Sequence, residues 1–483
     1  MTGPGLAHSA SSPGQVPTDR SFVIAACAAL LMLAVALFDG RLLHDGDTYW
    51  HLAAGEWMLR HGQVPHVDPF SFTRLGAPWQ AHEWLSEILM ALTFRLGGWN
   101  GLVVLYGAAL ALAALLLTRQ LARSLSSWLS LTLAVTLTLS CLAPSLLARP
   151  HVLVLPLVIG WTMVLLRARE AQRAPPWWAA VLILLWADLH GSFVFGFLLL
   201  GAFALEAIYE SPPSERLRSL WAWGLFSALS LCAAAVTPEG PWGLVFPFKL
   251  MGMTSLAGID EWRPTDFSRF SPFELGLAVT LFVCLTRGVR VAPVRVLLLI
   301  GLLHMALQHD RHVMVAALVA AMVLAGPIAT ALGQARPVPR PERIGGWLAF
   351  AAVALVLVGL RALTPLARLD GTTTPGAAID HVPADLRTRP LLNDYGFGGY
   401  LIYRGVRPYV DGRTDLYGDA FMDRYDRIMR ADPAVLDQTL LDQHVAWTIL
   451  RPGTPLAAVL DARPGWRRLY ADRFAVVHMR DSP

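Results

Sequence analysis

The sequence predicts a polytopic α-helical membrane protein with about eleven transmembrane helices and a small soluble α/β domain at its C-terminal end. Three observations lead to this fold class. Hydrophobic residues make up 55% of the 483 residues and the mean hydropathy is +0.49, which is high for a soluble protein. Apolar runs long enough to enter a bilayer recur along most of the chain. After Pro365 these runs stop, and a segment with balanced charge begins.

Residues 1–20, rich in Ser, Pro and Gly, are expected to form a disordered cytoplasmic tail. The apolar stretch that follows has no small-residue cleavage site behind it, which indicates a retained first span and not a signal peptide. The transmembrane domain is then expected to cover residues 21–365, with a large first outer loop at residues 40–100.

The predicted spans are the apolar runs that match a hydrocarbon core of about 30 Å. The apolar run at 83–98 is left out, because Glu83, Glu87 and Arg95 would be costly at bilayer depth, and it is expected to lie at the interface as a helix. The spans cover residues 21–39, 101–118, 125–143, 151–167, 176–189, 193–209, 219–236, 273–287, 294–307, 311–332 and 345–364.

Arginine-rich loops select this topology. With a cytoplasmic N-terminus, every second loop carries arginine and falls inside, whereas a span at 83–98 would move all of these loops outside. We therefore expect a multi-pass protein of the plasma (bacterial inner) membrane whose C-terminal domain is extracytoplasmic. The arginines are Arg119 and Arg123, those at 167–173, Arg216 and Arg218, those at 287–295 and those at 336–343.

The formal charge of +4 and the pI of about 9.0 reflect this topology and do not indicate nucleic-acid binding. Lys249 is the only lysine, and the four cysteines show no CxxC spacing, so neither a disulfide framework nor a zinc site is predicted. The same topology brings acids, imidazoles and guanidinium groups from separate loops to the outer face. This gathering favours a functional site there over simple anchoring of span ends.

The first outer loop is too long for a simple connector. Between Asp47 and Arg60 the apolar residues recur at helical spacing, which predicts an amphipathic helix on the membrane surface. Asp47 and His51, four residues apart, would share one face of this helix. The alternative is that Asp47 only caps the helix and that His51 is an ordinary surface residue.

The motifs of this loop resemble those of a known superfamily. The chain begins with one span, which is followed by a large outer loop that opens with Asp45-Gly-Asp47 and then by many more spans. This layout resembles that of the GT-C membrane glycosyltransferases. The segments DGDTYWHLAAGEWMLRHG, VPHVDPFSF and WQAHEWLSE look like a bacterial family related to the dolichyl-phosphate-mannose protein mannosyltransferases. The likeness also includes WADLHGSFVFG, EWRPTDF, NDYGFGGYLIYRG and VDGRTDLYGD, and so covers most of the chain.

The resemblance implies a GT-C-like fold and an inverting transfer of a hexose or pentose from a polyprenyl-phosphate donor to an extracytoplasmic glycan, lipid or protein. In the superfamily an acid at the start of this loop is the general base, a role that falls here on Asp47, with Asp45 as its rival. A carboxylate at a low-dielectric interface can have a raised pKa and still accept a proton. Asp68 is the best second acid, and an Asp-Pro turn is its alternative role.

The phosphate of a lipid donor needs fixed cations, because little else in a pocket at the membrane edge offsets its charge. Arg149, Arg263 and Arg311 are the candidates, and interfacial anchoring is the alternative role of each. No cofactor is predicted; the acids and histidines of the first loop leave open a divalent metal, although no HExxH-type spacing occurs. The further candidates for substrate binding are His51, His82, Glu83, His190 and His312.

The C-terminal domain is expected at residues 370–483 as a small α/β sandwich. Its loops carry Asp394, Asp411, Arg413, Asp415 and Tyr417, which suit sugar binding, with a structural Asp-Gly-Arg turn as the alternative. Strands are expected at 390–393, 407–411, 446–450, 466–471 and 474–479, and helices at 398–403, 420–430, 434–443 and 455–462.

Two other classes of protein were weighed against the glycosyltransferase. A transporter or flippase for a lipid-linked glycan should show internal repeats and polar residues at mid-membrane, and neither is found. A non-catalytic scaffold with a glycan-binding tail would tolerate the loss of Asp47 but not of the tail loops.

Overall fold

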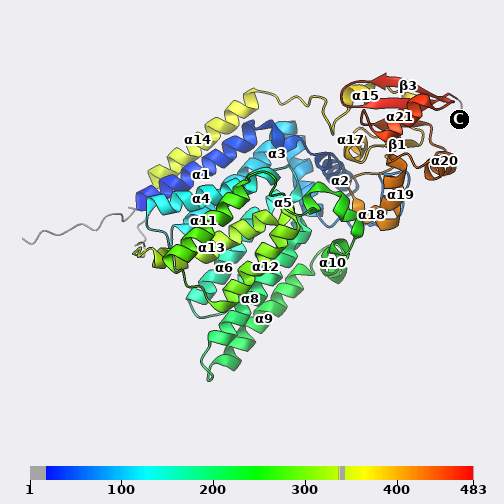
Figure 1. Cartoon of the computed structure of the whole chain (residues 1–483). Coiled ribbons are helices and arrows are strands. Elements are labelled where there is room, and N and C mark those ends of the chain that lie inside the picture. Colours follow the sequence, from blue (N-terminus) through cyan, green and yellow to red (C-terminus); the bar gives the residue numbers. More distant parts are fainter. Residues whose placement is uncertain (1–17, 336, 338–342, 482–483) are drawn as a thin grey trace, which may run out of the picture.

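The computed structural model describes residues 18–335, 337 and 343–481. Most of the predicted tail at 1–20 therefore lies outside the described residues, as does most of the basic loop at 336–343. Residues 18–20 belong to the first helix, α1 (Thr18–Phe38). Figure 1 shows a bundle of long helices with a small domain, drawn in orange and red, at one end.

A helix occupies each predicted span, so the protein is a multi-pass membrane protein. Eight described helices are long and apolar enough to cross a bilayer by length and composition, and the segments at 177–189, 272–287 and 293–308 are shorter, which makes the span count approximate. Besides α1, the helices of this region are α2 (Asp47–His61), α3 (Trp84–Leu121), α4 (Trp128–Leu142), α5 (Pro150–Leu153), α6 (Leu155–Glu170), α7 (Ala180–Leu189), α8 (Val194–Glu210), α9 (Arg216–Ala234), α10 (Phe246–Met251), α11 (Pro272–Arg287), α12 (Pro293–Gln308), α13 (Val313–Ala331) and α14 (Ile344–Leu363).

Helix α3 has a break in its backbone at Gly97 and Gly98, where the dihedral angles leave the helical region; Gly98 has φ of 56°. The second part corresponds to the predicted span at 101–118. The first part carries the charges that argued against a span, and they are paired: the Arg95 guanidinium lies 2.9 Å from the Glu56 carboxylate of α2. The run at 83–98 thus forms a helix that packs on α2.

Helix α1 lies between α3 and α14, as Figure 1 shows, and its Phe22 ring meets the Trp347 ring of α14 edge to face at 5.0 Å. The core of the bundle is a continuous cluster of buried Leu, Val, Ala and aromatic side chains from α1, α3, α4, α6, α8 and α13. Close packing among these helices fixes the loops at their ends, where the polar residues gather.

The C-terminal domain is built on a four-stranded sheet in the order β1-β2-β4-β3, in which β1 runs parallel to β2 and the other pairs are antiparallel. Its elements are α15 (Gly376–Asp380), α16 (Ala384–Arg387), β1 (Leu391–Asn393), α17 (Gly398–Tyr403), α18 (Thr414–Tyr417), α19 (Asp419–Met429), α20 (Pro433–Asp442), β2 (Trp447–Leu450), α21 (Pro455–Ala462), β3 (Trp466–Ala471) and β4 (Val476–Arg480).

The predicted strand at 407–411 is wrong. This segment is extended, but it pairs with one side chain instead of a neighbouring strand: the Asn393 side chain accepts from Tyr409 N at 2.8 Å and donates to Val410 O at 2.8 Å. The buried asparagine therefore satisfies backbone groups that a sheet would otherwise pair. The other predicted strands and helices of the domain are confirmed within one or two residues.

The C-terminal domain rests on the segment at 40–100 that contains α2. Helix α17 packs against α2, and a Cβ atom on Gly399 would overlap the backbone oxygen of Gly46. Only a glycine permits this approach. The motif that contains Gly399 thus serves to seat the domain beside the start of α2.

Candidate active site

A cavity with a volume of about 1030 Å³ lies between the start of α2 and the C-terminal domain. On the transmembrane side it is lined by loop residues that follow α1, α4, α7 and α10. On the other side it is lined by residues of α18, α19 and the turn after β1. The cavity therefore joins segments that are hundreds of residues apart in sequence. Its charged lining includes Asp45, Asp47, Arg149, Glu261, Arg311 and Asp415.

Helix α2 begins at Asp47 because the residues before it provide a start. The Asp45 carboxylate accepts a hydrogen bond from the Asp47 backbone N–H at 2.7 Å, which satisfies one of the free N–H groups of the first turn. Asp47 itself stands in that first turn, where the helix dipole favours a negative charge. The helix expected from Asp47 to Arg60 is confirmed as α2.

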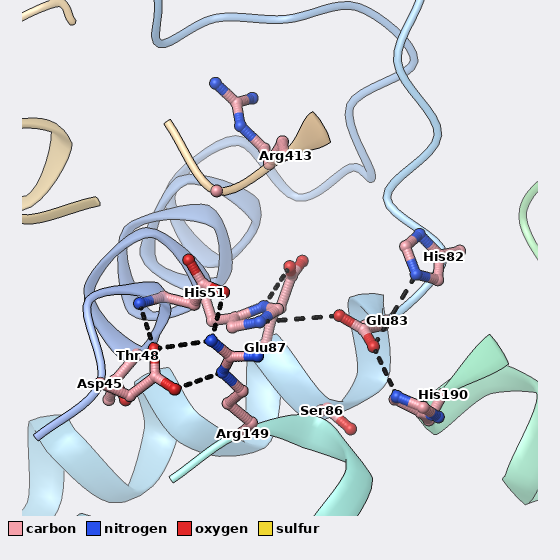
Figure 2. A network of polar contacts seen from close by, with 12 residues as sticks. Asp45, Thr48, His51, His82, Glu83, Ser86, Glu87, Arg149, His190 and Arg413 are labelled. Carbon is pink, nitrogen blue, oxygen red and sulfur yellow. Dashed lines mark hydrogen bonds and ion pairs between the residues drawn. The ribbon is translucent and has the colours of Figure 1, made fainter. Parts of the chain in front are cut away.

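The guanidinium group of Arg149 lies among three carboxylates (Figure 2 shows its contact with Asp45). It forms ion pairs with Asp45, with Asp47 at 2.8 Å and with Glu261 at 2.6 Å. Burial alone would lower the pKa of Arg149, but these three acids raise it well above its ordinary value. The Arg149 guanidinium is therefore permanently charged and lies beside the N-terminal end of α2.

Asp45 and Asp47 are placed differently. Asp45 is 7% exposed, and its oxygens are taken by Arg149 and by the Asp47 N–H. The Asp47 side chain is 23% exposed and faces the cavity, with Arg149 on one oxygen. Burial raises the pKa of Asp47 to about 6, against the lowering effect of Arg149 and with a further increase from Asp45. Asp47 is therefore the acid that combines access with a basicity suited to proton transfer near neutral pH.

The C-terminal domain covers Asp47 closely. A Cβ atom on Gly412 would overlap the Asp47 carboxylate, and Tyr395 Oη bonds to the Gly412 carbonyl at 3.3 Å and to Thr414 Oγ1 at 2.9 Å. The backbone of the VDGRTD motif thus lies directly over the acid. Gly412, Thr414 and Tyr395 therefore form the wall of the cavity next to Asp47.

Arg311 lies in the turn before α13 and lines the same cavity. Its guanidinium stacks over the Trp262 ring at 4.4 Å from the ring centre, and its carboxylate contact is with Glu261 at 3.4 Å. Arg149 and Arg311 together lower the pKa of Glu261 to about 2, although burial opposes them. One carboxylate is therefore shared by two arginines on facing loops.

A second network joins α2 to the start of α3 (Figure 2). His51, 3% exposed, lies 3.0 Å from Glu87 and 3.6 Å from Glu83, and Glu83 in turn lies 3.2 Å from His190 and 3.8 Å from His82. Burial lowers the pKa of His51 and raises the pKa of Glu83. A neutral imidazole has one N–H group, so His51 can donate to only one of its two neighbouring carboxylates. His51 is thus a buried part of the site wall and not a surface residue.

An apolar cavity of about 320 Å³ adjoins the first one. Both are lined by His82, Glu83, His151, His190, Glu261, Trp262 and Arg311. From these residues the second cavity extends between α6, α8 and α13, where Val154, Val158, Phe195 and Val315 line it. His312 also lines it. The polar site therefore opens into an apolar space between helices.

Three of the predicted site residues lie apart from this group. Asp68 is buried and bonded to Arg413 at 2.7 Å and to Ser71 Oγ at 2.5 Å, and it lines neither cavity. Arg263 is exposed and also lines neither. His312 lines the apolar cavity only.

The candidates of the C-terminal domain divide into two groups. Asp411, Arg413 and Tyr417 are buried against one another, with Tyr417 Oη 2.7 Å from the Asp411 carboxylate, which is the structural alternative for the Asp-Gly-Arg segment. Asp394 and Asp415 line the cavity. Glu261 and Glu87 were not among the site residues predicted from the sequence. The EWRPTDF segment contains Glu261 and could have pointed to it, whereas nothing in the helical spacing distinguished Glu87. Within the described part of the chain, no three His, Cys, Asp or Glu side chains are grouped to hold a metal ion.

The fold is similar to those of two solved membrane glycosyltransferases. The oligosaccharyltransferase of Archaeoglobus fulgidus in its apo form matches with a TM-score of 0.50 and 11% identity, over 89% of this chain and 69% of that one. ArnT from Cupriavidus metallidurans bound to undecaprenyl phosphate matches with a TM-score of 0.50 and 12% identity, over 94% of this chain and 97% of that one. No family model and no curated protein matches the sequence. Both solved structures have the GT-C fold, which confirms the fold expected from the sequence motifs.

Proposed function

We propose that this GT-C-fold membrane protein transfers a sugar from a polyprenyl-phosphate donor to a hydroxyl group of an acceptor, with inversion at the anomeric carbon. The observation that carries the proposal is the continuity of the two cavities. An accessible carboxylate with a pKa near 6, an arginine pair and an apolar space between helices adjoin one another. These are the parts that a base, a phosphate and a lipid chain need.

The donor would lie with its phosphate at Arg311 and Arg149 and its lipid chain in the apolar cavity. Arg311 is the better anchor, because its one carboxylate contact is long, at 3.4 Å, whereas Arg149 already holds three acids. The likeness to ArnT bound to undecaprenyl phosphate supports a lipid donor of this class. His190 and His82, at the junction of the cavities, would contact the donor between phosphate and sugar.

In the proposed reaction the acceptor oxygen attacks the anomeric carbon as the bond from that carbon to the phosphate oxygen breaks. The acceptor proton passes to Asp47, and the polyprenyl phosphate leaves with the electron pair, its charge offset by the arginines. A single displacement needs one carboxylate as base and no nucleophilic carboxylate. Asp68, held by Arg413, then has the role of a structural acid.

The topology inferred from the arginine-rich loops would put this site and the C-terminal domain on the outer face of the bacterial inner membrane. The acceptor would be an extracytoplasmic glycan, lipid or protein. No specific observation favours the transporter or the scaffold alternative. Neither of them gives a role to the Asp47 carboxylate beside the two arginines.

Turnover by the purified protein in lipid nanodiscs tests the proposal. Polyprenyl-phosphate hexoses and pentoses would be supplied with a mixed panel of hydroxyl acceptors, and release of polyprenyl phosphate would be measured together with the configuration of the new bond. Release coupled to glycoside formation with inversion is the expected result. Glycoside formed with retention would contradict the single-displacement mechanism.

The pH dependence of this turnover is expected to show an acidic limb near pH 6. Asp47 accepts a proton only when ionised, so the rate should rise as pH increases through its pKa of about 6 and fall off below it. Burial also raises the pKa of Asp415 to about 6, so the profile is measured in the Asp415→Asn variant as well. Persistence of the limb in that variant would assign it to Asp47, and its disappearance there would assign it to Asp415.

Replacing Arg311 by methionine is expected to lower kcat/KM for the donor about 10- to 100-fold, mainly through KM, because a charged hydrogen bond to phosphate contributes about 1.5–3 kcal/mol. Arg263→Met is the matched control: it removes a nearby outer-face arginine that lines neither cavity, and it should change kcat/KM less than about twofold. Equal losses in the two variants would contradict the assignment of the phosphate site to Arg311.

A further inference from the structure

Glu261 places a negative charge at the point where the phosphate of the proposed donor would lie. Of the charged residues that the structure describes, three line both cavities: Glu83, Glu261 and Arg311. Glu83 faces the rings of the neighbouring histidines, and burial raises its pKa. Glu261 is therefore the acid that faces Arg311 at the junction of the two cavities.

The Glu261 carboxylate is an ionised neighbour of both arginines. It lies 2.6 Å from Arg149 and 3.4 Å from Arg311, and its side chain is 29% exposed. Although burial opposes ionisation, the two arginines lower its pKa to about 2. Arg149 also pairs with Asp45 and Asp47. The arginines therefore offer a ligand little positive charge that is not already compensated.

Contacts of the surrounding chain hold Glu261 beside Arg311 independently of their ion pair. The two residues belong to short turns that contact each other. The ring of His309 donates to the Trp262 carbonyl oxygen at 2.6 Å, and the Arg311 guanidinium lies over the Trp262 ring at 4.4 Å from its centre. The Glu261 carboxylate therefore stays close to any anion that Arg311 binds.

The charge of the phosphate changes during the proposed reaction. In the donor the phosphate is a diester and carries one negative charge. The polyprenyl phosphate that leaves is a monoester, which carries about two negative charges when the pH is above its second pKa of about 6. A carboxylate beside the phosphate thus repels the product about twice as strongly as it repels the donor.

We propose that Glu261 is a specificity-determining residue: it makes the site select a singly charged phosphodiester and promotes the release of the doubly charged polyprenyl phosphate. This inference rests on the proposed function and adds to it the charge that the donor phosphate must carry. The same balance disfavours diphosphate-linked donors, which carry one negative charge more. Without Glu261 the arginines would hold the leaving phosphate more tightly.

Two matched lipids test the inference: a polyprenyl phosphate and its methyl ester with the same chain. At about pH 8 the first carries about two negative charges, whereas the ester carries one. Binding of each lipid to the full-length protein in nanodiscs of zwitterionic lipid gives the ratio of their dissociation constants. Wild type is expected to bind the ester at least as tightly as the phosphate, whereas Glu261→Gln should favour the phosphate by about tenfold.

Three variants separate charge from geometry. Glutamine at position 261 keeps the size of the side chain and an oxygen that accepts from Arg149, so Glu261→Gln removes the charge alone. Glu261→Asp keeps the charge and should keep the ratio of wild type. Glu239→Gln removes an acid that pairs with His66 and lines neither cavity, and it should also keep that ratio.

The possible outcomes distinguish this inference from the proposed function. If both lipids bind but Glu261→Gln leaves their ratio unchanged, Glu261 does not select the charge, while the donor site stands. A tenfold preference of wild type for the phosphate would overturn the inference in the same way, even if Glu261→Gln did not fold. An equal shift in Glu261→Asp would assign the effect to geometry and also overturn it. If neither lipid binds to wild type, the donor site and the inference both fail.

Discussion

Replacing Asp47 by asparagine is expected to lower sugar transfer by about 10²- to 10⁴-fold, the usual contribution of a positioned general base. Asparagine keeps the size of the side chain and can still accept from Arg149, but it cannot take a proton from the acceptor. The loss should appear in kcat more than in KM, because the carboxylate acts on the reacting hydroxyl and not on the lipid.

The fold should survive this substitution. Arg149 keeps Asp45 and Glu261 as partners, and burial raises the pKa of Asp47, so its charged form is not a net stabiliser of the folded protein. The temperature of unfolding in nanodiscs is therefore expected to be unchanged or slightly higher. Loss of turnover together with loss of folded protein would mean that Asp47 has a structural role.

Asp45→Asn is the matched comparison, since it removes the neighbouring acid. Asp45 holds Arg149 and the first N–H of α2, so its variant should unfold at a lower temperature and lose activity only in part. An unaffected rate in Asp47→Asn with a large loss in Asp45→Asn would transfer the role of base to Asp45. The two variants thus decide between the two acids of the DGD motif.

The parts of the molecule that sequence predicts well are those governed by local pattern. Hydropathy identifies the spans because the bilayer requires continuous apolar helices, and the spacing between Asp47 and Arg60 identifies α2 because one face of it is buried. The segment at 407–411 fails for a local reason as well: alternating residues resemble a strand, but the Asn393 side chain takes its backbone hydrogen bonds.

The site is only partly accessible to such reasoning. Arg149 and Arg311 can be nominated because charge at span ends is costly and therefore conspicuous. Asp47 is nominated through the resemblance of its segment to the GT-C enzymes. The burial of His51 between Glu83 and Glu87 depends on how α2 packs against α3. The spacing of residues along either helix does not predict this packing. The same holds for the cavity wall formed by the C-terminal domain, because the contact of Gly412 with Asp47 joins segments far apart in the chain.

The second large effect is expected for Arg413→Met, which removes the ion pair between Asp68, in the segment at 40–100, and the C-terminal domain. Arg413 is 1% exposed, lies 2.7 Å from Asp68 and 2.7 Å from Asp411, and stacks over the Trp79 ring at 4.7 Å. Without it two buried carboxylates lose their cation. Breaking a buried pair in this way costs about 3–5 kcal/mol, far more than the pair contributes relative to apolar residues.

The variant is expected to unfold at a clearly lower temperature, and its C-terminal domain should become sensitive to proteolysis before the bundle does. Arg427→Met, which breaks an exposed pair with Asp432, is the control and should leave the temperature of unfolding nearly unchanged. Adding Asp68→Asn to Arg413→Met should restore part of the loss, because it removes one of the unpaired charges. Similar unfolding of the two single variants would show that the pair does not hold the domain.

The same substitution also connects stability to catalysis. Arg413 follows Gly412, whose backbone covers Asp47, so a loosened domain would expose the carboxylate to water and lower its pKa toward that of a free acid. The acidic limb of the rate profile should then move below pH 6 in whatever folded Arg413→Met protein remains, whereas it should stay in place in Arg427→Met. A limb that does not move, in a variant whose domain has become sensitive to proteolysis, would mean that the C-terminal domain has no part in setting the basicity of Asp47.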